Sequence, residues 1–362
     1  MESMKKILCL LALGAVVSGV ASAPFGVSGG PALAATTKTL GQVTAFGAAD
    51  NGQGGQGGQN GQDTPHFLPS TLDMVPAETP ETGSEPKGDA AYGAFQRGRY
   101  LTAIKLAMPL AKLGDPAAQT LVAELYARGL GVPKDMELAA KWYGIAAGSG
   151  DTASQLKYAL LLLEGRYVTP DKVHAKELMR RAADAGNSSA QFNYGQLLIT
   201  EKPGREGVQQ ALPYMTSAAE NGIADAQFAL AQIYAYGVGL EKDDPYTARR
   251  WLLRAARSGF DTAQLDLGVW LIDGIGGKID YDAGFGWMRR AANSGNTMAQ
   301  NRLSHLYINA IGTRPDPIEA AKWYIISRRA GLEDRRLEDF FQGLTAAEQK
   351  AGIEASNNFR TR

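Results

Sequence analysis

The hydrophobic and polar positions repeat along the chain with a period of about 36 residues from residue 89 onward. Each period contains a glutamine that follows a small residue, and successive glutamines are separated by 36, 36, 36, 37 and 36 residues. A small residue follows each glutamine by four positions, and in five of the six periods one or two glycines follow it by ten or twelve. Because glycine reaches the backbone angles that end a helix, this pattern predicts a helix terminated by a glycine turn. The six glutamines are Gln119, Gln155, Gln191, Gln227, Gln264 and Gln300.

A second helix is predicted between each glycine turn and the next glutamine. Its apolar residues recur every three or four positions, which is the spacing of a helix and not of a strand. Capping residues mark its start at Asp244-Pro245, Thr169-Pro170 and residues 316–319. A large anchor side chain occupies its middle, and a glycine follows the anchor by eight positions. The anchors are Trp142, Leu178, Trp251, Trp287 and Trp323.

Each period is therefore predicted to form a helical hairpin that cannot bury its own apolar face, so neighbouring hairpins must stack. The predicted fold class is all-α, an α-solenoid of about six hairpins in residues 117–331. Residues 89–116 lack the glutamine and are expected to form an N-terminal capping hairpin. Residues 332–362 are expected to form C-terminal capping helices, the last opened by Thr345 and Glu348 as a capping box.

Four motifs at this period resemble the Sel1-like repeat family, a relative of the tetratricopeptide repeat. They are the small residue before glutamine, the Tyr-x-x-Gly-x-Gly turn, the Ala-x-x-Trp anchor and the Ala-Ala-x-x-Gly end. The resemblance covers about residues 90–345 and implies a right-handed solenoid that acts as an adaptor. Exported bacterial members of the family include regulators of membrane sensor kinases that control polysaccharide output, envelope assembly factors and host-contact proteins. The resemblance implies a mode of action but no particular ligand.

The third period departs from the pattern. Glu201 and Gly204 stand where the glycine pair is expected, and Tyr214 replaces the tryptophan anchor. Because a proline interrupts helical hydrogen bonding, Pro213 predicts that the second helix of this period starts late. We expect the amides between Gln191 and Gly222 to be the least protected from hydrogen exchange.

Residues 1–34 have the layout of a secretory signal peptide. Lys5 and Lys6 precede an apolar run that is too short for a transmembrane helix and passes into small residues. Residues 35–88 are rich in Gly and Gln and then in Pro, which predicts a disordered tether. The single cysteine, Cys9, lies in the signal, so we expect a mature chain without a thiol or a membrane span. The expected location is the periplasm of a Gram-negative bacterium or its exterior.

The charge balance gives no indication of a nucleic-acid ligand, because Lys and Arg total 37 and Asp and Glu total 37. We predict no catalytic, cofactor-binding or metal-binding residue, since His174 and His305 lie in different periods and no titratable set converges. Two Ser-x-x-Lys matches, at 84–87 and 154–157, leave a penicillin-recognising, β-lactamase-like enzyme as an alternative. The stretch GIGGK at 274–278 lacks the spacing of a phosphate loop.

A partner-binding groove is expected on the first helices, where side chains that are not used for stacking would meet a peptide or a helix. At Phe192 and Phe228 a place in the hydrophobic core is an equally good interpretation. Arg181, Arg254 and Arg290 recur three positions after the anchor, either as solvated side chains or as a ladder for an acidic partner or polysaccharide. The predicted groove residues are Leu160, Leu163, Phe192, Gln196, Phe228, Gln232, Tyr236, Leu265 and Val269.

The sequence thus predicts a non-enzymatic, exported scaffold for protein–protein interaction. Its expected role is to regulate or assemble envelope functions, such as a sensor kinase or the polysaccharide machinery. The alternatives are the penicillin-recognising enzyme and a polysaccharide-binding module.

Overall fold

The computed structural model describes residues 87–360, and the structural statements below concern these residues. They form sixteen helices and no strand, which confirms the predicted all-α solenoid class. The predicted signal peptide at 1–34 and almost all of the predicted tether at 35–88 lie outside the described residues. Helix α2 begins at Lys87, two residues before the expected start of the N-terminal hairpin.

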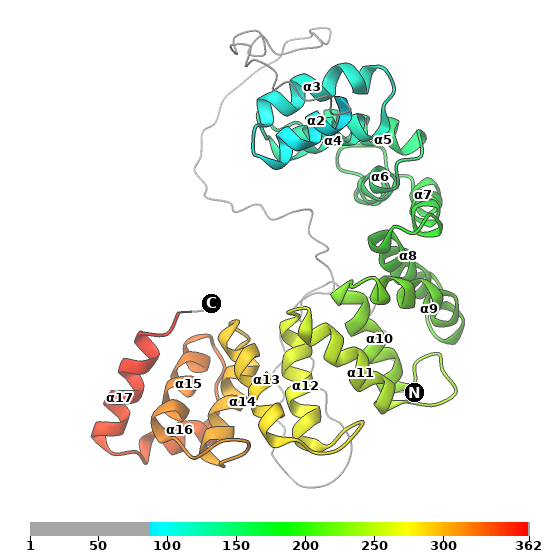
Figure 1. Ribbon diagram of the computed structural model, residues 1–362. Helices are drawn as coiled ribbons and strands as arrows, with labels where there is room; N and C mark the ends of the chain where they lie inside the picture. Colours follow the sequence, from blue (N-terminus) through cyan, green and yellow to red (C-terminus); the bar gives the residue numbers. More distant parts are fainter. Residues whose placement is uncertain (1–86, 361–362) are drawn as a thin grey trace. The chain divides into compact units, whose positions relative to one another are not determined.

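The helices follow one another through short turns (Figure 1). Six hairpins, α4/α5 to α14/α15, correspond to the six periods, while α2/α3 precede them and α16/α17 follow them. The bounds are α2 Lys87–Gln96, α3 Tyr100–Lys112, α4 Pro116–Arg128, α5 Met136–Gly148, α6 Thr152–Glu164, α7 Lys172–Asp184, α8 Ser188–Glu201, α9 Arg205–Glu220, α10 Ala224–Tyr236, α11 Pro245–Arg257, α12 Asp261–Asp273, α13 Tyr281–Asn293, α14 Thr297–Ile308, α15 Pro317–Arg329, α16 Arg335–Gln342 and α17 Ala346–Asn357.

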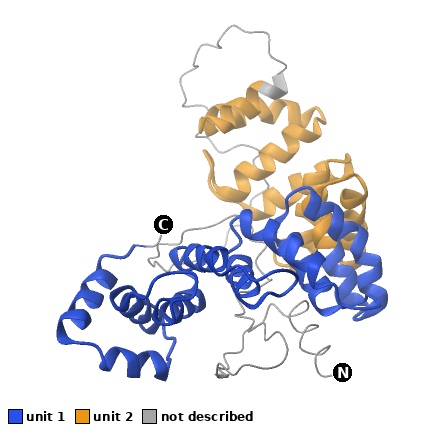
Figure 2. Ribbon diagram, turned by 60° about the horizontal axis from the view of Figure 1, so that its bottom comes forward, with its two compact units in different colours: residues 1–43, 195–362 blue, residues 44–194 orange. Residues whose placement is uncertain are grey.

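The helices belong to two compact units (Figure 2). The described part of unit 2 is 87–194, and that of unit 1 is 195–360, so the division falls inside α8. Within each unit the first helix of a hairpin packs on the second, and the second packs on the first helix of the next hairpin. In unit 1, for example, α12 packs on α13 and α13 packs on α14.

Glycines with positive φ close the turns between the paired helices. In four hairpins the residue ten positions after the glutamine is a glycine in the left-handed conformation, as at Gly274 with φ +72°. In the last hairpin Ala310, with φ +54°, takes this position instead. The second glycine allows a close backbone approach, because a Cβ on Gly276 would lie 2.2 Å from the carbonyl oxygen of Pro245.

Aspartate N-caps begin five of the six second helices. Asp244 and Asp316 cap α11 and α15 with a proline directly after them, as predicted. The prediction for Thr169-Pro170 is wrong, because the side chain that caps α7 belongs to Asp171, whose Oδ1 accepts from the backbone N–H of His174 at 2.9 Å. Aspartate satisfies a free N–H and carries the charge that the helix N-terminus favours.

Helix α9 contradicts the expectation of a late start. It begins directly after Gly204 and continues through Pro213. The carbonyl that the missing N–H of Pro213 leaves free belongs to Gln209, and both residues are exposed, so that water can bond to that carbonyl. The proline is therefore accommodated on the solvent side of the helix, and Tyr214 takes the half-buried anchor position.

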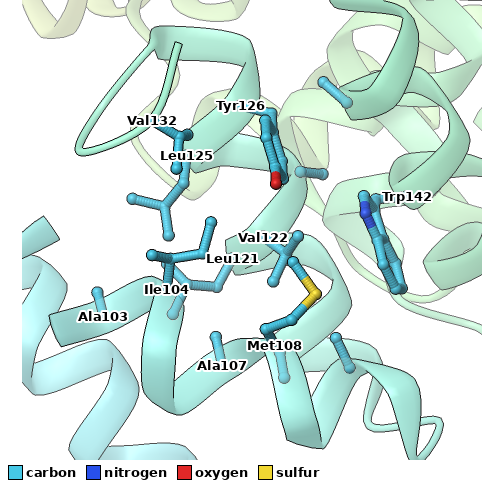
Figure 3. Close-up of a cluster of buried hydrophobic side chains, with 14 of the residues drawn as sticks. Ala103, Ile104, Ala107, Met108, Leu121, Val122, Leu125, Tyr126, Val132 and Trp142 are labelled. Atoms are coloured by element: carbon cyan, nitrogen blue, oxygen red, sulfur yellow. The ribbon is translucent and has the colours of Figure 1, made fainter. Parts of the chain in front are cut away.

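The core of unit 2 lies between successive hairpins (Figure 3). Ile104 of α3 packs with Val122 and Leu125 of α4, all with 0% of their surface exposed. Trp142 of α5 is 7% exposed and joins the same cluster. In unit 1 Trp323 is 2% exposed, so the large anchor contributes to a core that no single hairpin could form alone.

Small residues four positions after each glutamine permit the helices of a hairpin to approach closely. A Cβ on Gly268 of α12 would lie 3.1 Å from the carbonyl oxygen of Gly284 in α13. In the last hairpin the Oγ of Ser304 donates to the carbonyl of Ala320 at 2.7 Å. Larger side chains would separate the two helices.

Each repeated glutamine binds the end of the preceding hairpin. Its Nε2 donates to the carbonyl of an alanine eight residues earlier, in the last turn of the previous second helix. We call this contact the glutamine clasp. Gln349 of α17 donates in the same way to the carbonyl of Phe341 of α16, eight residues earlier, at 3.0 Å, so the C-terminal helices also contain a glutamine clasp. The clasp supplies a partner for a helix end whose carbonyls lack one within the helix.

Candidate partner-binding face

The first helices of unit 1 carry a common stripe two, five and nine positions after the glutamine. Such positions share one side of an α-helix. We call this stripe the A-helix face. Asp266 and Ala229 on it are buried, whereas the other members are half-buried or exposed. The face consists of Ala229, Gln232 and Tyr236 of α10, Asp266, Val269 and Asp273 of α12, and Arg302, His305 and Asn309 of α14.

Asp266 is the central charge of the A-helix face. It is 7% exposed, and within the described residues its side chain makes no hydrogen bond and no ion pair. Burial disfavours the charged carboxylate and raises its pKa to about 7, although the positive charge of Arg302 acts in the opposite direction. The oxygens of Asp266 are not fully enclosed, so water can bond to them until a partner that supplies hydrogen-bond donors takes its place.

Asp266 affects the pKa values of two neighbouring residues, Tyr236 and Arg302. Burial and the nearby carboxylate raise the pKa of Tyr236 to about 12. Burial lowers the pKa of Arg302, while Asp266 and Asp273 oppose the shift. Arg302 makes no hydrogen bond or ion pair within the described residues, so its guanidinium donors, like the acceptors of Asp266, are available to a partner.

His305 belongs to a second polar contact on this face. Its Nε2 lies 2.8 Å from Oδ2 of Asp334, which also accepts from Nδ2 of Asn301 at 3.1 Å. Burial alone would raise the pKa of Asp334, but the hydrogen bonds from His305 and Asn301 hold it below its ordinary value. Because the other oxygen of Asp334 caps α16, this cluster ties α14 to the start of the C-terminal helices.

Unit 2 has its own polar cluster at the corresponding positions. The hydroxyl of Tyr143 donates to Oε2 of Glu124 at 2.5 Å, and Arg128 lies 3.6 Å from the same carboxylate. Burial lowers the pKa of Lys157, and Glu124 opposes this. In contrast to Asp266, the carboxylate of Glu124 is satisfied inside the protein.

The structure divides the nine predicted groove residues. Phe192, Phe228 and Leu265 are 2%, 7% and 2% exposed, so the alternative left open for the two phenylalanines is decided in favour of the core. The residue directly after the glutamine points between helices and packs there, as Phe228 does against Phe260 with ring centroids 4.9 Å apart. The half-buried remainder stays a predicted site: Leu160, Leu163, Gln196, Gln232, Tyr236 and Val269.

Sequence reasoning missed Asp266 and Arg302, because the position two residues after the glutamine was not assigned to the binding face. A signal was present. In four of the six periods a charged or polar residue, Lys157, Asn193, Asp266 or Arg302, occupies a position where Leu121 and Ala229 show that apolar residues also fit. Charges at a position that tolerates burial indicate a site rather than a solvated surface.

Ser154, the residue of the Ser-x-x-Lys match in the repeats, has no exposed surface. Its Oγ lies 2.7 Å from the hydroxyl oxygen of Thr120, which joins α6 to α4. A substrate carbonyl cannot reach this hydroxyl, and the residue serves packing. Ser84 lies outside the described residues.

The other candidates have structural roles. The exposed His174 lies edge-on to Tyr158 with ring centroids 6.3 Å apart. The GIGGK loop is held by Arg249, whose guanidinium donates to the carbonyls of Ile275 and Lys278 at 3.3 and 3.1 Å. In residues 87–360 no group of three or more His, Cys, Asp or Glu side chains could hold a metal ion. No helix in the same range is long and apolar enough to cross a membrane.

Comparison with known proteins identifies the repeat. The family model described as Sel1 repeat matches residues 116–151, 152–187, 188–223, 224–260, 262–296 and 297–332. Each match begins with a first helix and ends after the glycine that follows the second helix. The six matches correspond to the six hairpins of the structure.

Two solved structures are similar over most of the chain. One is c5321 of uropathogenic Escherichia coli, a protective antigen with an SLR fold, at 26% identity and a TM-score of 0.63 over 75% of this chain and 60% of that one. The chain thus spans less than two thirds of the length of the E. coli protein. The other is a Sel1 repeat protein from Oxalobacter formigenes, at 27% identity and a TM-score of 0.58 over 69% of this chain and 100% of that one. A search of curated proteins found no match.

Proposed function

Because the chain belongs to the Sel1 repeat family, we propose that it is an exported scaffold that binds a partner protein at the A-helix face of unit 1. Sel1 repeats mediate protein–protein interaction. The role that we propose for the complex is regulation or assembly in the bacterial envelope, for example of a sensor kinase or of polysaccharide machinery. The location rests on the signal-like residues 1–34.

The observation that supports this site is a carboxyl group and a guanidinium at its centre that have no protein partner in the described residues. The buried carboxyl of Asp266 lacks a donor and the guanidinium of Arg302 lacks an acceptor in the described part of the chain. A peptide group supplies both an N–H and a C=O, so a segment of partner main chain that crosses the face can satisfy the two residues together. Half-buried Tyr236 and Val269 add apolar surface beside them.

One description from the comparison bears on the proposed location. The E. coli protein is described as a protective antigen. This description concerns that protein, and its extension to the present chain is part of the proposal. Detection of the chain in a periplasmic fraction of its own host, with residues 1–34 removed, would test the point.

Site-specific cross-linking tests the binding face. A photo-cross-linking amino acid replaces Gln232 on the face or, as a control, Val173, which is 82% exposed on α7 of the other unit. We expect a defined adduct from the Gln232 position in cells, and none from the Val173 position. The adduct should be lost when Arg302→Glu is added, provided that the circular dichroism spectrum is unchanged. Equal adducts from both positions would contradict the proposal.

A further inference from the structure

Helices α11 and α13 carry a concentration of exposed arginines on a surface other than the A-helix face. In the described residues none of them makes an ion pair or a side-chain hydrogen bond to the protein. We call this surface the arginine face. It comprises Arg250, Arg254 and Arg257 of α11, and Arg289 and Arg290 of α13.

The second helix of an earlier repeat, α7, provides a comparison, because its exposed arginines form ion pairs within the helix. On α7 Arg180 lies 3.0 Å from Glu177 and 3.1 Å from Asp184, and Arg181 lies 3.0 Å from Glu177. Such pairs one helical turn apart neutralise the charge locally. The sequence of α11, PYTARRWLLRAAR, contains no acidic residue, so its positive charge is uncompensated within the helix.

Two of the arginines are held by tryptophans in equivalent positions. The guanidinium carbon of Arg254 lies 4.8 Å from the ring centroid of Trp251, and that of Arg290 lies 4.8 Å from the ring centroid of Trp287. Both tryptophans are half-buried and pack against one core cluster, which also contains Leu252. Stacking on a fixed ring limits the rotation of the guanidinium without using its N–H donors.

A groove adjoins the arginine face at the start of α11. Its lining includes Arg250, Leu253 and Lys278, together with two apolar side chains in unusually exposed positions. Tyr246 is 66% exposed and Ile279 is 54% exposed. The groove therefore offers apolar contact next to positive charge.

The groove has a fixed shape on its loop side. Arg249 donates to two carbonyls of the loop, and a Cβ on Gly277 would lie 2.8 Å from an Arg249 nitrogen. Asp280 also lines the groove, but its Oδ1 accepts from the backbone N–H of Ala283 at 2.9 Å as the N-cap of α13. The local carboxylate is thus engaged, and the positive charge of the groove remains.

We propose that the arginine face and its groove bind an acidic segment of a partner protein. Carboxylates match the planar donors of arginine, and the exposed tyrosine and isoleucine match apolar side chains of the same segment. Arg, Tyr and Trp are the residues that dominate the energetics of protein interfaces, and all three occur here together. This inference rests on the proposed function as a scaffold and names the chemistry of a partner.

Peptide binding tests the proposal on the full chain. The probe is a fluorescent peptide rich in Asp and Glu that contains one phenylalanine, and the reference peptide has Asn and Gln in their place. We expect the acidic peptide alone to bind, and the double variant Arg254→Gln/Arg290→Gln to weaken binding about tenfold. The double variant Arg180→Gln/Arg181→Gln changes the charge equally and should leave the affinity within about twofold.

A conservative pair adds a second measurement. Arg254→Lys/Arg290→Lys keeps the charge but lacks the planar fork, so we expect an affinity between those of the wild type and the glutamine variant. Equal weakening by the α7 and the α11/α13 variants would overturn the proposal, because it would show attraction by net charge alone. Binding of polymannuronate or of anionic lipid vesicles, without binding of the acidic peptide, would overturn it in favour of a polysaccharide or a membrane.

The result is separable from the proposed function. Suppose that a partner is cross-linked through Gln232, that this adduct is unaffected by the Arg254 and Arg290 variants, and that the acidic peptide does not bind. This result would overturn the proposal for the arginine face and leave the proposed binding site on the A-helix face intact. Binding of the acidic peptide at the arginine face, without any adduct through Gln232, would overturn the A-helix face and leave the arginine face intact.

Discussion

The side-chain amide of Gln227 donates to the carbonyl of Ala219 at 2.9 Å, and its Oε1 accepts from the hydroxyl of Ser258 at 3.2 Å. Both polar ends of this glutamine are therefore satisfied. The equivalent Gln264 makes the same contact to Ala256 at 3.1 Å, but its Oε1 is buried without a partner in the described residues. Two copies of one motif thus differ in the hydrogen bonding of a single oxygen.

This difference predicts unequal costs for the same substitution. Gln227→Met removes two hydrogen bonds and should lower the free energy of unfolding by about 1 to 2 kcal/mol. Gln264→Met removes one hydrogen bond and also an unsatisfied oxygen, so the cost should be less than half as large. Urea unfolding of both variants measures the difference, and a larger cost for Gln264→Met would contradict it.

Asp266 predicts a loss of stability as the pH rises. Its pKa is raised in the folded chain to about 7, whereas an unfolded Asp has a pKa of about 3.9. Between these values the unfolded form gives up its proton first, so the free energy of unfolding falls by up to about 1.4 kcal/mol per pH unit. Asp266→Asn lacks this ionisation and should gain on the wild type as the pH rises from about 4 to 7.

Paired urea titrations at the two ends of this range provide the measurement. We expect the two proteins to be similar near the acid end and the variant to be more stable by a few kcal/mol near the neutral end. Asp273→Asn provides a comparison with a smaller expected effect, because this side chain is more exposed and its pKa is raised in the same direction. A stability difference that is constant with pH would show that Asp266 is already ionised in the folded chain.

The turn glycines predict a graded response to alanine. Gly276 and Gly259 both have positive φ, +68° and +87°, so alanine at either position costs about 1 to 2 kcal/mol from the backbone alone. A Cβ on Gly276 would also collide with the carbonyl of Pro245, whereas no atom lies within 4 Å of a Cβ on Gly259. Gly276→Ala should therefore cost more by about 2 kcal/mol or above, as thermal unfolding can show. Similar melting temperatures for the two variants would refute the steric argument.

Pro213 predicts a gain in stability on replacement. Pro213→Ala restores an N–H that can reach the carbonyl of Gln209 inside α9, and a proline in a helix interior costs up to about 3 kcal/mol. We expect slower hydrogen exchange of the amides in 205–220. Pro245→Ala is the control, because this proline occupies the first turn of α11 and its removal should give no gain.

The period of the sequence was sufficient to predict the hairpins, because helix spacing, glycine turns and stacking follow from local chemistry. The predictions from Thr169 and Pro213 were wrong because each rested on a local signal alone. Asp171 competed successfully with Thr169 as a cap, and solvent tolerated the proline in α9. Capping and proline preferences give the free-energy cost of a residue at a position, but they do not show whether neighbouring residues or solvent offset that cost.

The face could be predicted only in part. The glutamines marked the register, yet their contact to the preceding alanine carbonyl depends on how neighbouring hairpins pack, which a period does not reveal. For the same reason Phe228 and Leu265 could not be separated from Gln232 and Val269 before their burial was known. The environment of Asp266 depends on three helices from different repeats, and no single repeat encodes it.

The glutamine clasp has a direction. Every second helix that it closes depends on a donor that lies further along the polypeptide, never on one that precedes it. A chain that ends directly after the glycine that follows a second helix would keep a complete hairpin, but it would lack the glutamine that donates to the end of that hairpin. A chain that ends one helix later would keep both the hairpin and the glutamine. Insertion or loss of whole periods during evolution leaves every such dependence intact, which makes the length of the array far easier to change than its register.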